Sequence, residues 1–231
     1  MFASSTMFNL SKFIPRDLLV DSNSSINIDI MNFLSIDCST DVGSLFVKAK
    51  NKSFSKILQS DKSNNDLLMK QILDFFKEIN LKFDDISNIF VNQGPGNFSG
   101  LRGSLAIAKG MSLSKNLDLF GYNTPILSCV KFFSKEDFIY SLIKFRNKYF
   151  VKKFDKNLNS DLDIQEIKID EIIKKYDKKL KIVPRNIIQY FDKKILTLSN
   201  LNIVDLDYNG LEFLQLKGLL NKEFIKPLYL S

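Results

Sequence analysis

Hydrophobic and polar residues change from a strand-like to a helical spacing in the first third of the chain. Three short apolar runs, joined by short turns, predict an antiparallel meander at residues 31–37, 43–49 and 53–58. Residues 66–80 then predict a helix with Asp66 as its N-cap. Apolar residues cover about half of its circumference, wider than the ~100° stripe that packing on one sheet requires. One face of this helix is therefore predicted to contact another surface.

A strand, a loop, a helix and another strand follow in that order. The predicted segments are 87–92 for the first strand, 100–115 for the helix and 118–122 for the second strand. This succession is typical of parallel strands whose connection covers the sheet. Pro125 opens another short predicted helix, which runs through Phe133.

The second half shows weaker patterns of the same kind. Predicted strands are 137–145 and 148–155, which form a hairpin, followed by 166–169, 181–183 and 202–205. Predicted helices are 171–178, 186–191 and 211–222. The patterns predict an α/β protein with a first lobe at 31–133 and a second, degenerate lobe at 134–231. Residues 1–30 are interpreted as a loosely ordered extension, and the alternative is an extra element packed on the fold.

Composition excludes several classes of protein. The 231 residues are 45% hydrophobic with a net charge of +7, and no apolar run reaches the ~18 residues that a membrane-spanning helix needs. The absence of histidine excludes Ser/His/Asp and Cys/His catalysis and histidine-ligated zinc. The two cysteines, Cys38 and Cys129, show no disulfide or metal spacing, which fits a reducing cytosol. Because the lysines are scattered, we favour a compositional bias over selection for nucleic acid, although such contact stays open.

The sequence GPGNFSGLRG, at residues 94–103, holds four of the nine glycines of the chain. It is not a Walker A loop, because no Lys-Ser or Lys-Thr follows, and Ser99 stands where a dinucleotide-binding fingerprint has its third glycine. We predict a tight turn followed by a helix cap from Asn97 or Ser99. The residues of this turn and cap are Gly94, Pro95, Gly96, Asn97, Ser99 and Gly100.

The predicted helix after this loop has two distinct faces. Arg102 lies in its first turn, where a cation opposes the helix dipole, so we expect an anion or a carboxylate as its partner. Gly103, Ala106 and Gly110 share one face, which lets a neighbouring backbone come close, and that neighbour is either another surface or the chain's own sheet. If this face packs on the sheet, the outer surface is the opposite face. The opposite face is predicted to point outward and carries Leu101, Leu105, Ala108 and Ser112.

Several motifs resemble those of the bacterial TsaB family, also called YeaZ-like proteins. IDCST at residues 36–40 is similar to the family's IDTST-like strand end, and GPGNFSGLR at 94–102 to its GPGSFTGLR-like loop. KPLYL at 226–230 resembles the family's closing Pro-x-Tyr-Leu. The resemblance implies an actin-like, Hsp70-like (ASKHA) fold, with two lobes of ribonuclease H-like mixed sheets flanked by helices.

The same resemblance implies a non-catalytic paralogue of TsaD, the transferase that makes threonylcarbamoyladenosine next to the anticodon of tRNA. It implies a cytoplasmic complex in which the chain pairs with TsaD, the ATPase TsaE joins, and tRNA is bound through the complex. ATP and threonylcarbamoyl-adenylate then belong to the complex, and the chain needs no cofactor or metal of its own. A homodimer of the free chain is left open.

Carried over by position, the family's partner-binding helices are 66–80 and 100–115. The interface residues expected on them are Leu68, Ile72, Phe75, Phe76, Leu101, Arg102, Leu105 and Ala108. The alternatives are an independent actin-like ATPase or kinase and, disfavoured by the absent histidines, a metallopeptidase. Asp37 is interpreted as a turn-former rather than a cation ligand.

Overall fold

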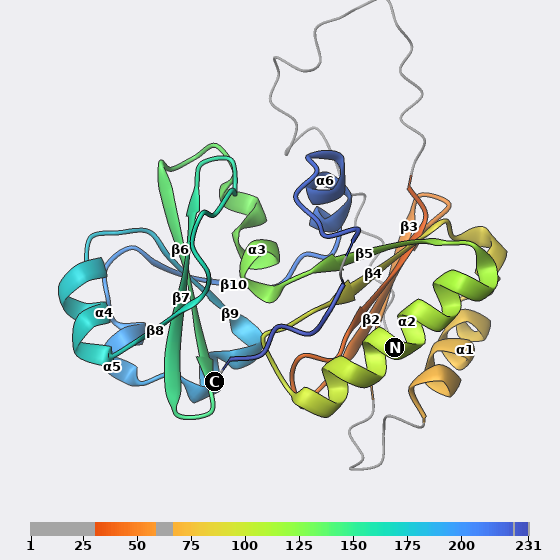
Figure 1. Ribbon diagram of the computed structural model, residues 1–231, viewed down its shortest axis with the longest axis horizontal. Coiled ribbons are helices and arrows are strands. Elements are labelled where there is room, and N and C mark those ends of the chain that lie inside the picture. The colour runs from red at the N-terminus through yellow and green to blue at the C-terminus, as the bar shows by residue number, and fades with distance from the viewer. Residues whose placement is uncertain (1–30, 59–66, 224, 231) are drawn as a thin grey trace, which may run out of the picture.

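The computed structural model describes residues 31–58, 67–223 and 225–230. Two five-stranded sheets, each flanked by helices, stand side by side (Figure 1). The strand order is β3-β2-β1-β4-β5 in the first sheet and β10-β9-β6-β7-β8 in the second. The predicted extension at 1–30 and the predicted cap Asp66 lie outside the described residues.

The first sheet joins antiparallel and parallel strands at its centre. Its strands are β1 (Phe33–Asp37), β2 (Ser44–Ala49), β3 (Lys52–Ile57), β4 (Asn88–Asn92) and β5 (Asp118–Tyr122). The first three form the predicted meander, while β4 is parallel to both β1 and β5. The carboxyl ends of β1 and β4 therefore meet at one edge of the sheet, which brings Asp37 next to Asn92.

Two helices cover one face of this sheet (Figure 1). They are α1 (Leu68–Glu78) and α2 (Phe98–Lys115), and the short helix η3 (Phe83–Asp85) leads into β4. The N-cap position of α1 is Leu67, which makes no side-chain cap. The start of α2 at Phe98 is slightly earlier than the predicted Gly100, because Asn97 caps it. The predicted helix from Pro125 to Phe133 is α3 (Thr124–Cys129) followed by η4 (Val130–Phe132).

The second sheet carries smaller helices. Its strands are β6 (Phe138–Phe145), β7 (Lys148–Asp155), β8 (Gln165–Ile167), β9 (Lys181–Pro184) and β10 (Leu201–Val204). The helices are α4 (Ile169–Tyr176), η5 (Arg185–Tyr190), α5 (Lys193–Leu196) and α6 (Gly210–Leu216). The hairpin of β6 and β7 is confirmed, whereas α5 is not predicted by the sequence pattern. The helix predicted at 211–222 ends at Leu216 because Gly218, at φ +68°, closes it.

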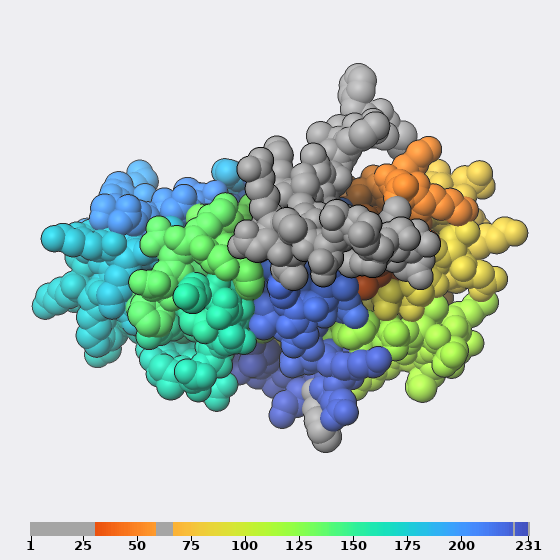
Figure 2. All heavy atoms as spheres, turned by 90° about the horizontal axis from the view of Figure 1, so that it is seen from above, coloured from red at the N-terminus to blue at the C-terminus, as the bar shows by residue number. Residues whose placement is uncertain are grey.

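Both faces of the first sheet are buried. Leu34 and Ile36 belong to the core beneath α1 and α2, whereas Phe33 and Phe90, from the opposite face, pack edge to face with ring centroids 4.8 Å apart. That second core includes Leu211 and Leu214 of α6. The chain therefore returns from the second sheet to the first, and its C-terminal part fills the space between the lobes in Figure 2.

A buried ion pair holds α6 against β2 of the first sheet. Lys48 of β2 donates to Glu212 of α6, and the Met31 backbone N–H donates to the other carboxylate oxygen at 3.3 Å.

The predicted lobe boundary at residues 133 and 134 stays a prediction. In the part of the chain that the structure describes, every helix is too short or too polar to cross a membrane.

Candidate functional site

The loop after β4 is held by the backbone and side chains of the same lobe. Gly94 has φ +106°, a left-handed value that favours glycine, and its peptide bond to Pro95 is cis. Its N–H donates to the Asn92 side chain at 2.8 Å, and its carbonyl accepts from the Thr124 N–H at 3.0 Å. The turn therefore connects the ends of β4 and β5.

Two glycines of this loop allow a very close approach to the β1–β2 connection. A Cβ at Gly96 would stand 1.9 Å from the Ser39 carbonyl oxygen, and one at Gly100 would stand 2.4 Å from the Cys38 carbonyl oxygen. The Asn97 N–H donates to the Ser39 carbonyl at 2.8 Å, and the Asn97 side chain accepts from the Ser99 N–H. These glycines therefore serve backbone packing, and of the two cap residues the structure uses Asn97.

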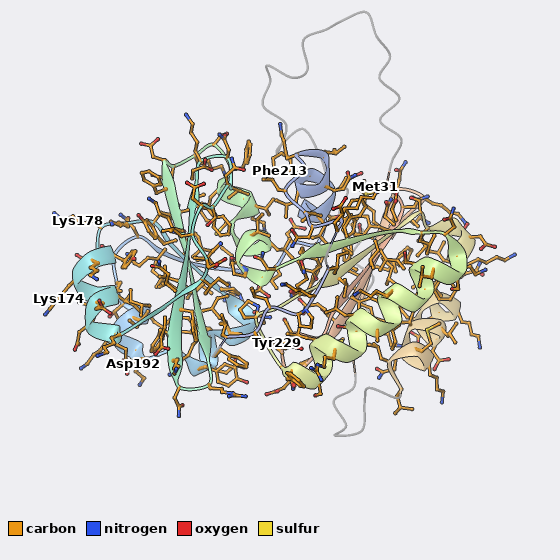
Figure 3. All side chains as sticks on the ribbon, in the orientation of Figure 1. Met31, Lys174, Lys178, Asp192, Phe213 and Tyr229 are labelled. Atoms are coloured by element: carbon orange, nitrogen blue, oxygen red, sulfur yellow. The ribbon has the colours of Figure 1, made fainter. Side chains whose placement is uncertain are left out.

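Arg102 has a partner of a different kind from the one predicted. Its Nε donates to the Tyr229 hydroxyl at 3.0 Å, and its guanidinium carbon lies 3.9 Å from the centroid of the Phe98 ring. Phe98 and Tyr229 stack at 5.0 Å between centroids, and Figure 3 labels Tyr229 beside the first turn of α2. Among the described residues, the partners of Arg102 are thus an aromatic face and a neutral hydroxyl in place of the predicted carboxylate, and the predicted anion stays a prediction.

Asp37 is the centre of a buried hydrogen-bond network. One carboxylate oxygen accepts from the Ser39 N–H at 3.0 Å and from the Ser39 hydroxyl at 2.7 Å. The other oxygen accepts from Asn92 at 2.9 Å and from the Tyr208 hydroxyl at 3.1 Å. Four donors therefore use both oxygens of a side chain that is only 4% exposed. The Ser39 contacts agree with the interpretation of Asp37 as a turn-former.

The network extends across the interface between the two halves of the chain. Burial, with a further contribution from the Asp37 charge, raises the pKa of Tyr208 well above its usual value. Tyr208 therefore stays protonated and donates to Asp37. Its oxygen also lies 2.9 Å from the Ser44 hydroxyl. Sequence patterns do not indicate Tyr208, because it lies far from Asp37 along the chain.

Two kinds of chemistry, metal binding and attack by a thiol, are not supported by the described residues of this site. Within residues 31–58, 67–223 and 225–230, no three His, Cys, Asp or Glu side chains gather closely enough to hold a metal ion. Cys38 lies beside Asp37, and burial, reinforced by the Asp37 charge, raises its pKa to about 12. A thiol with this pKa is almost fully protonated at neutral pH, which makes it a weak nucleophile.

The helix faces are the reverse of those predicted. Arg102 is exposed, but the other expected interface residues are buried in the lobe's own core: Leu68, Ile72, Phe75, Phe76, Leu101, Leu105 and Ala108. The small-residue face of α2 points outward instead, and a Cβ at Gly110 would meet nothing within 4 Å. Burying leucine removes more apolar surface from water than burying glycine, so the leucine face packs on the sheet. The prediction of an outward Leu101, Leu105 and Ala108 is therefore wrong.

Several apolar side chains do remain exposed on these two helices. Met69 and Leu73 of α1 are partly exposed, and Leu113 of α2 is 86% exposed. α1 and α2 contact each other and cover the same face of the sheet (Figure 1). We call this surface, with Met69, Leu73, Ala106, Gly110 and Leu113, the α1/α2 outer face.

A cavity of about 390 Å³ lies between the lobes. The first lobe contributes residues 39–41 after β1, residues 95–97 before α2, Phe98 at the start of α2, and Thr124. The second lobe contributes the tip of the β6–β7 hairpin at 143–146, together with Ile187 and Tyr190 of η5. The network around Asp37 lies behind this cavity, since Ser39 and Thr124 belong to both. None of the cavity residues of the second lobe is indicated by a sequence motif.

Parts of the chain match known proteins of tRNA threonylcarbamoyladenosine biosynthesis. Residues 59–132 match the model of TsaD, the tRNA N6-adenosine threonylcarbamoyltransferase family. The chain is 33% identical over 90 residues to the tRNA threonylcarbamoyladenosine biosynthesis protein TsaB of Buchnera aphidicola subsp. Baizongia pistaciae, a match that covers 38% of this chain and 40% of the relative. It is 30% identical over 91 residues to the protein of the same name from subsp. Schizaphis graminum, covering 39% and 43%. The chain therefore spans less than half the length of these curated relatives.

Two solved structures share the fold over most of the chain. One is a Pseudomonas aeruginosa protein described as uncharacterized with similarity to peptidase YeaZ, with a TM-score of 0.66. The other is YeaZ from the same organism, with a TM-score of 0.63. Each is 13% identical and covers 87% of this chain and 100% of its own. The chain thus shares its fold with these two structures, and the predicted mixed sheets flanked by helices are confirmed.

Proposed function

We propose that this chain is a member of the TsaB/YeaZ family, which its partial sequence matches and its fold support. In this proposal it is a partner subunit in the biosynthesis of threonylcarbamoyladenosine in tRNA and performs no catalysis of its own. It binds and activates a TsaD-like transferase. A TsaE-like ATPase joins the assembly, and tRNA is bound through the complex.

The state of Asp37 is the observation that best supports a role without catalysis. A carboxylate at the end of the first strand is well placed to bind a cation or to accept a proton in the cleft between the lobes. Here one carboxylate oxygen accepts from Ser39, and the other accepts from Asn92 and Tyr208. Using this carboxylate in catalysis would require breaking bonds that are buried, and each such bond to a charged group is worth roughly 1.5–3 kcal/mol.

Cofactors belong to the partners in this proposal. ATP and threonylcarbamoyl-adenylate are used by the TsaE-like and TsaD-like subunits, and the chain itself needs neither. The absence of histidine from all 231 residues supports this assignment, because it removes the commonest ligand of catalytic transition metals and the usual acid or base at neutral pH.

The α1/α2 outer face is the surface that we assign to the transferase. Leu73 and Leu113 provide exposed apolar area, and Gly110 allows the backbone of a partner helix to approach closely. Contiguous exposed apolar patches rimmed by polar residues are typical of protein–protein contacts, and we assign these residues to such a patch. The residues that carry the contact therefore differ from the buried set expected from the sequence.

The test replaces exposed leucines by glutamate. Leu73→Glu combined with Leu113→Glu places two charges on the outer face, and we expect loss of co-purification with the transferase. Leu216→Glu, at a leucine of α6 that is 64% exposed, is the matched control and retains it. A reconstituted mixture of transferase, ATPase and adenylate should modify tRNA only when the wild-type chain or the control is added. Full modification without the chain, or ATP turnover by the chain alone, would overturn the proposal.

A further inference from the structure

Two cations, Lys144 and Arg146, line the cavity between the lobes, and a third, Arg102, contacts the lining residue Phe98. Among the residues that the structure describes, no ion pair to a carboxylate involves Arg102, Lys144 or Arg146. Lys144 lies over the Tyr149 ring at 4.8 Å and Arg146 over the Phe145 ring at 5.4 Å. These charges are therefore available to an anionic ligand.

Half-exposed aromatic rings stand among these cations. Phe98 is 49% exposed, Tyr190 is 46% exposed and Tyr229 is 47% exposed. Phe98 and Tyr190 line the cavity, and Tyr229 stacks on Phe98 at its rim. They come from α2, η5 and the C-terminal segment, so two separate elements line the cavity with aromatic rings and a third packs against one of these rings.

The described lining of the cavity also contains one carboxylate. Asp41 lines the cavity and lies 3.5 Å from the Tyr190 hydroxyl. With Lys144 and Arg146 on the same wall, the described lining keeps an excess of positive charge. A carboxylate here accepts hydrogen bonds from a ligand that carries hydroxyl or amino groups as well as anionic ones.

Rings alternating with cations, together with a hydrogen-bond acceptor, are the side-chain set that binds single-stranded nucleic acid. Bases stack on aromatic faces, phosphates pair with lysine and arginine, and a ribose 2′-hydroxyl can donate to a carboxylate. The cavity volume also lies within the range of roughly 300–1,000 Å³ that is usual for small-molecule sites.

We propose that the opening between the lobes binds an unpaired nucleotide of an RNA strand. The base stacks at Tyr190, across the cavity from the Phe98 side, the flanking phosphates pair with Lys144 and Arg146, and Asp41 accepts from the ribose. This inference rests on the proposed function, which supplies tRNA as the polyanion. It adds a direct contact with RNA on a surface separate from the α1/α2 outer face.

The test measures fluorescence anisotropy of a labelled short single-stranded RNA with the isolated full chain. The variant Lys144→Gln/Arg146→Gln should bind more weakly and should lower the salt dependence of log K by about 0.7 for each phosphate that is no longer neutralised. The matched control is Lys174→Gln/Lys178→Gln, two exposed lysines on and after α4 at the far end of the second lobe (Figure 3), which should change binding less. Tyr190→Ala should weaken binding roughly fivefold or more while leaving the salt slope unchanged.

Competition binding experiments decide whether the ligand is an RNA strand or a free mononucleotide. RNA must bind more tightly than AMP or ATP, because neighbouring phosphates and bases add contacts. Equal binding of a free mononucleotide would overturn the RNA proposal, as would equal effects of the cleft variant and the α4 control. Co-purification with the transferase is measured on the same variants. The cleft variant retains it and the Leu73/Leu113 variant loses it, so failure of one proposal is distinguishable from failure of the other.

Discussion

The Tyr208 hydroxyl donates a hydrogen bond of 3.1 Å to the Asp37 carboxylate, although the two residues are 171 positions apart in the sequence. Tyr208→Phe removes this donor from a buried charge and should lower the free energy of unfolding by about 1.5–3 kcal/mol. The measurement is the midpoint and slope of urea unfolding. Tyr190→Phe removes a hydroxyl from an exposed ring and should change stability by less than about 0.5 kcal/mol. Equal effects of the two variants would contradict the role given to Tyr208.

The Lys48–Glu212 ion pair should be strongly coupled. Glu212→Gln leaves the Lys48 ammonium buried without its carboxylate and should cost about 3–5 kcal/mol. Adding Lys48→Met removes the unpaired charge, so the double variant should be more stable than Glu212→Gln alone. Chemical unfolding of both single variants and the double variant gives the coupling energy. Simple addition of the two single effects would show that the pair does not hold α6 to β2.

Replacing either of two glycines of this region by alanine should change the stability of the fold, in opposite directions for the two positions. Gly96→Ala forces a methyl group against the Ser39 carbonyl and should destabilise the fold by about 1–3 kcal/mol. Gly110→Ala meets open space within α2 and should stabilise the chain by about 0.5–1 kcal/mol. Thermal unfolding of the two variants tests both signs. A loss of stability in Gly110→Ala would mean that the outer face of α2 is not open.

The buried Cys129 thiol should make stability fall at alkaline pH. Burial raises its pKa from the ordinary 9.0 to about 12. The folded chain keeps a proton that the unfolded chain releases, so this contribution is complete below pH 9 and is lost as the pH rises toward 12. The free energy of unfolding should therefore fall between these limits, by at most about 1.4 kcal/mol per pH unit for this group. Cys129→Ala should make the fall shallower, and an unchanged pH profile would contradict the assignment.

Much of the fold follows from the spacing of apolar residues. The meander, the parallel unit and the β6–β7 hairpin are short-range patterns whose partners lie close in sequence, so local rules suffice to predict them. The end of α6 is missed because it depends on one backbone angle at Gly218. The small helix α5 is missed because its four residues, Lys193–Leu196, are too few for a periodic pattern.

The candidate site is harder to predict, for a physical reason. Spacing identifies two faces of α2, but both are apolar or small, and only packing decides which one is buried. The predicted faces are consequently reversed. The partner of Arg102 is Tyr229, 127 residues away, and that of Asp37 is Tyr208. Such long-range pairs cannot be derived from periodicity, although Tyr229 does belong to the closing KPLYL motif that the sequence singles out.

The return of α6 to the first sheet has a consequence for the order of folding during synthesis. The core beneath α1 and α2 includes Ile225, and the opposite core includes Leu211 and Leu214. A growing chain emerges from the ribosome with its N-terminal part first. The first sheet therefore lacks part of both cores, and Lys48 lacks its carboxylate partner, until residues 211–225 have been translated.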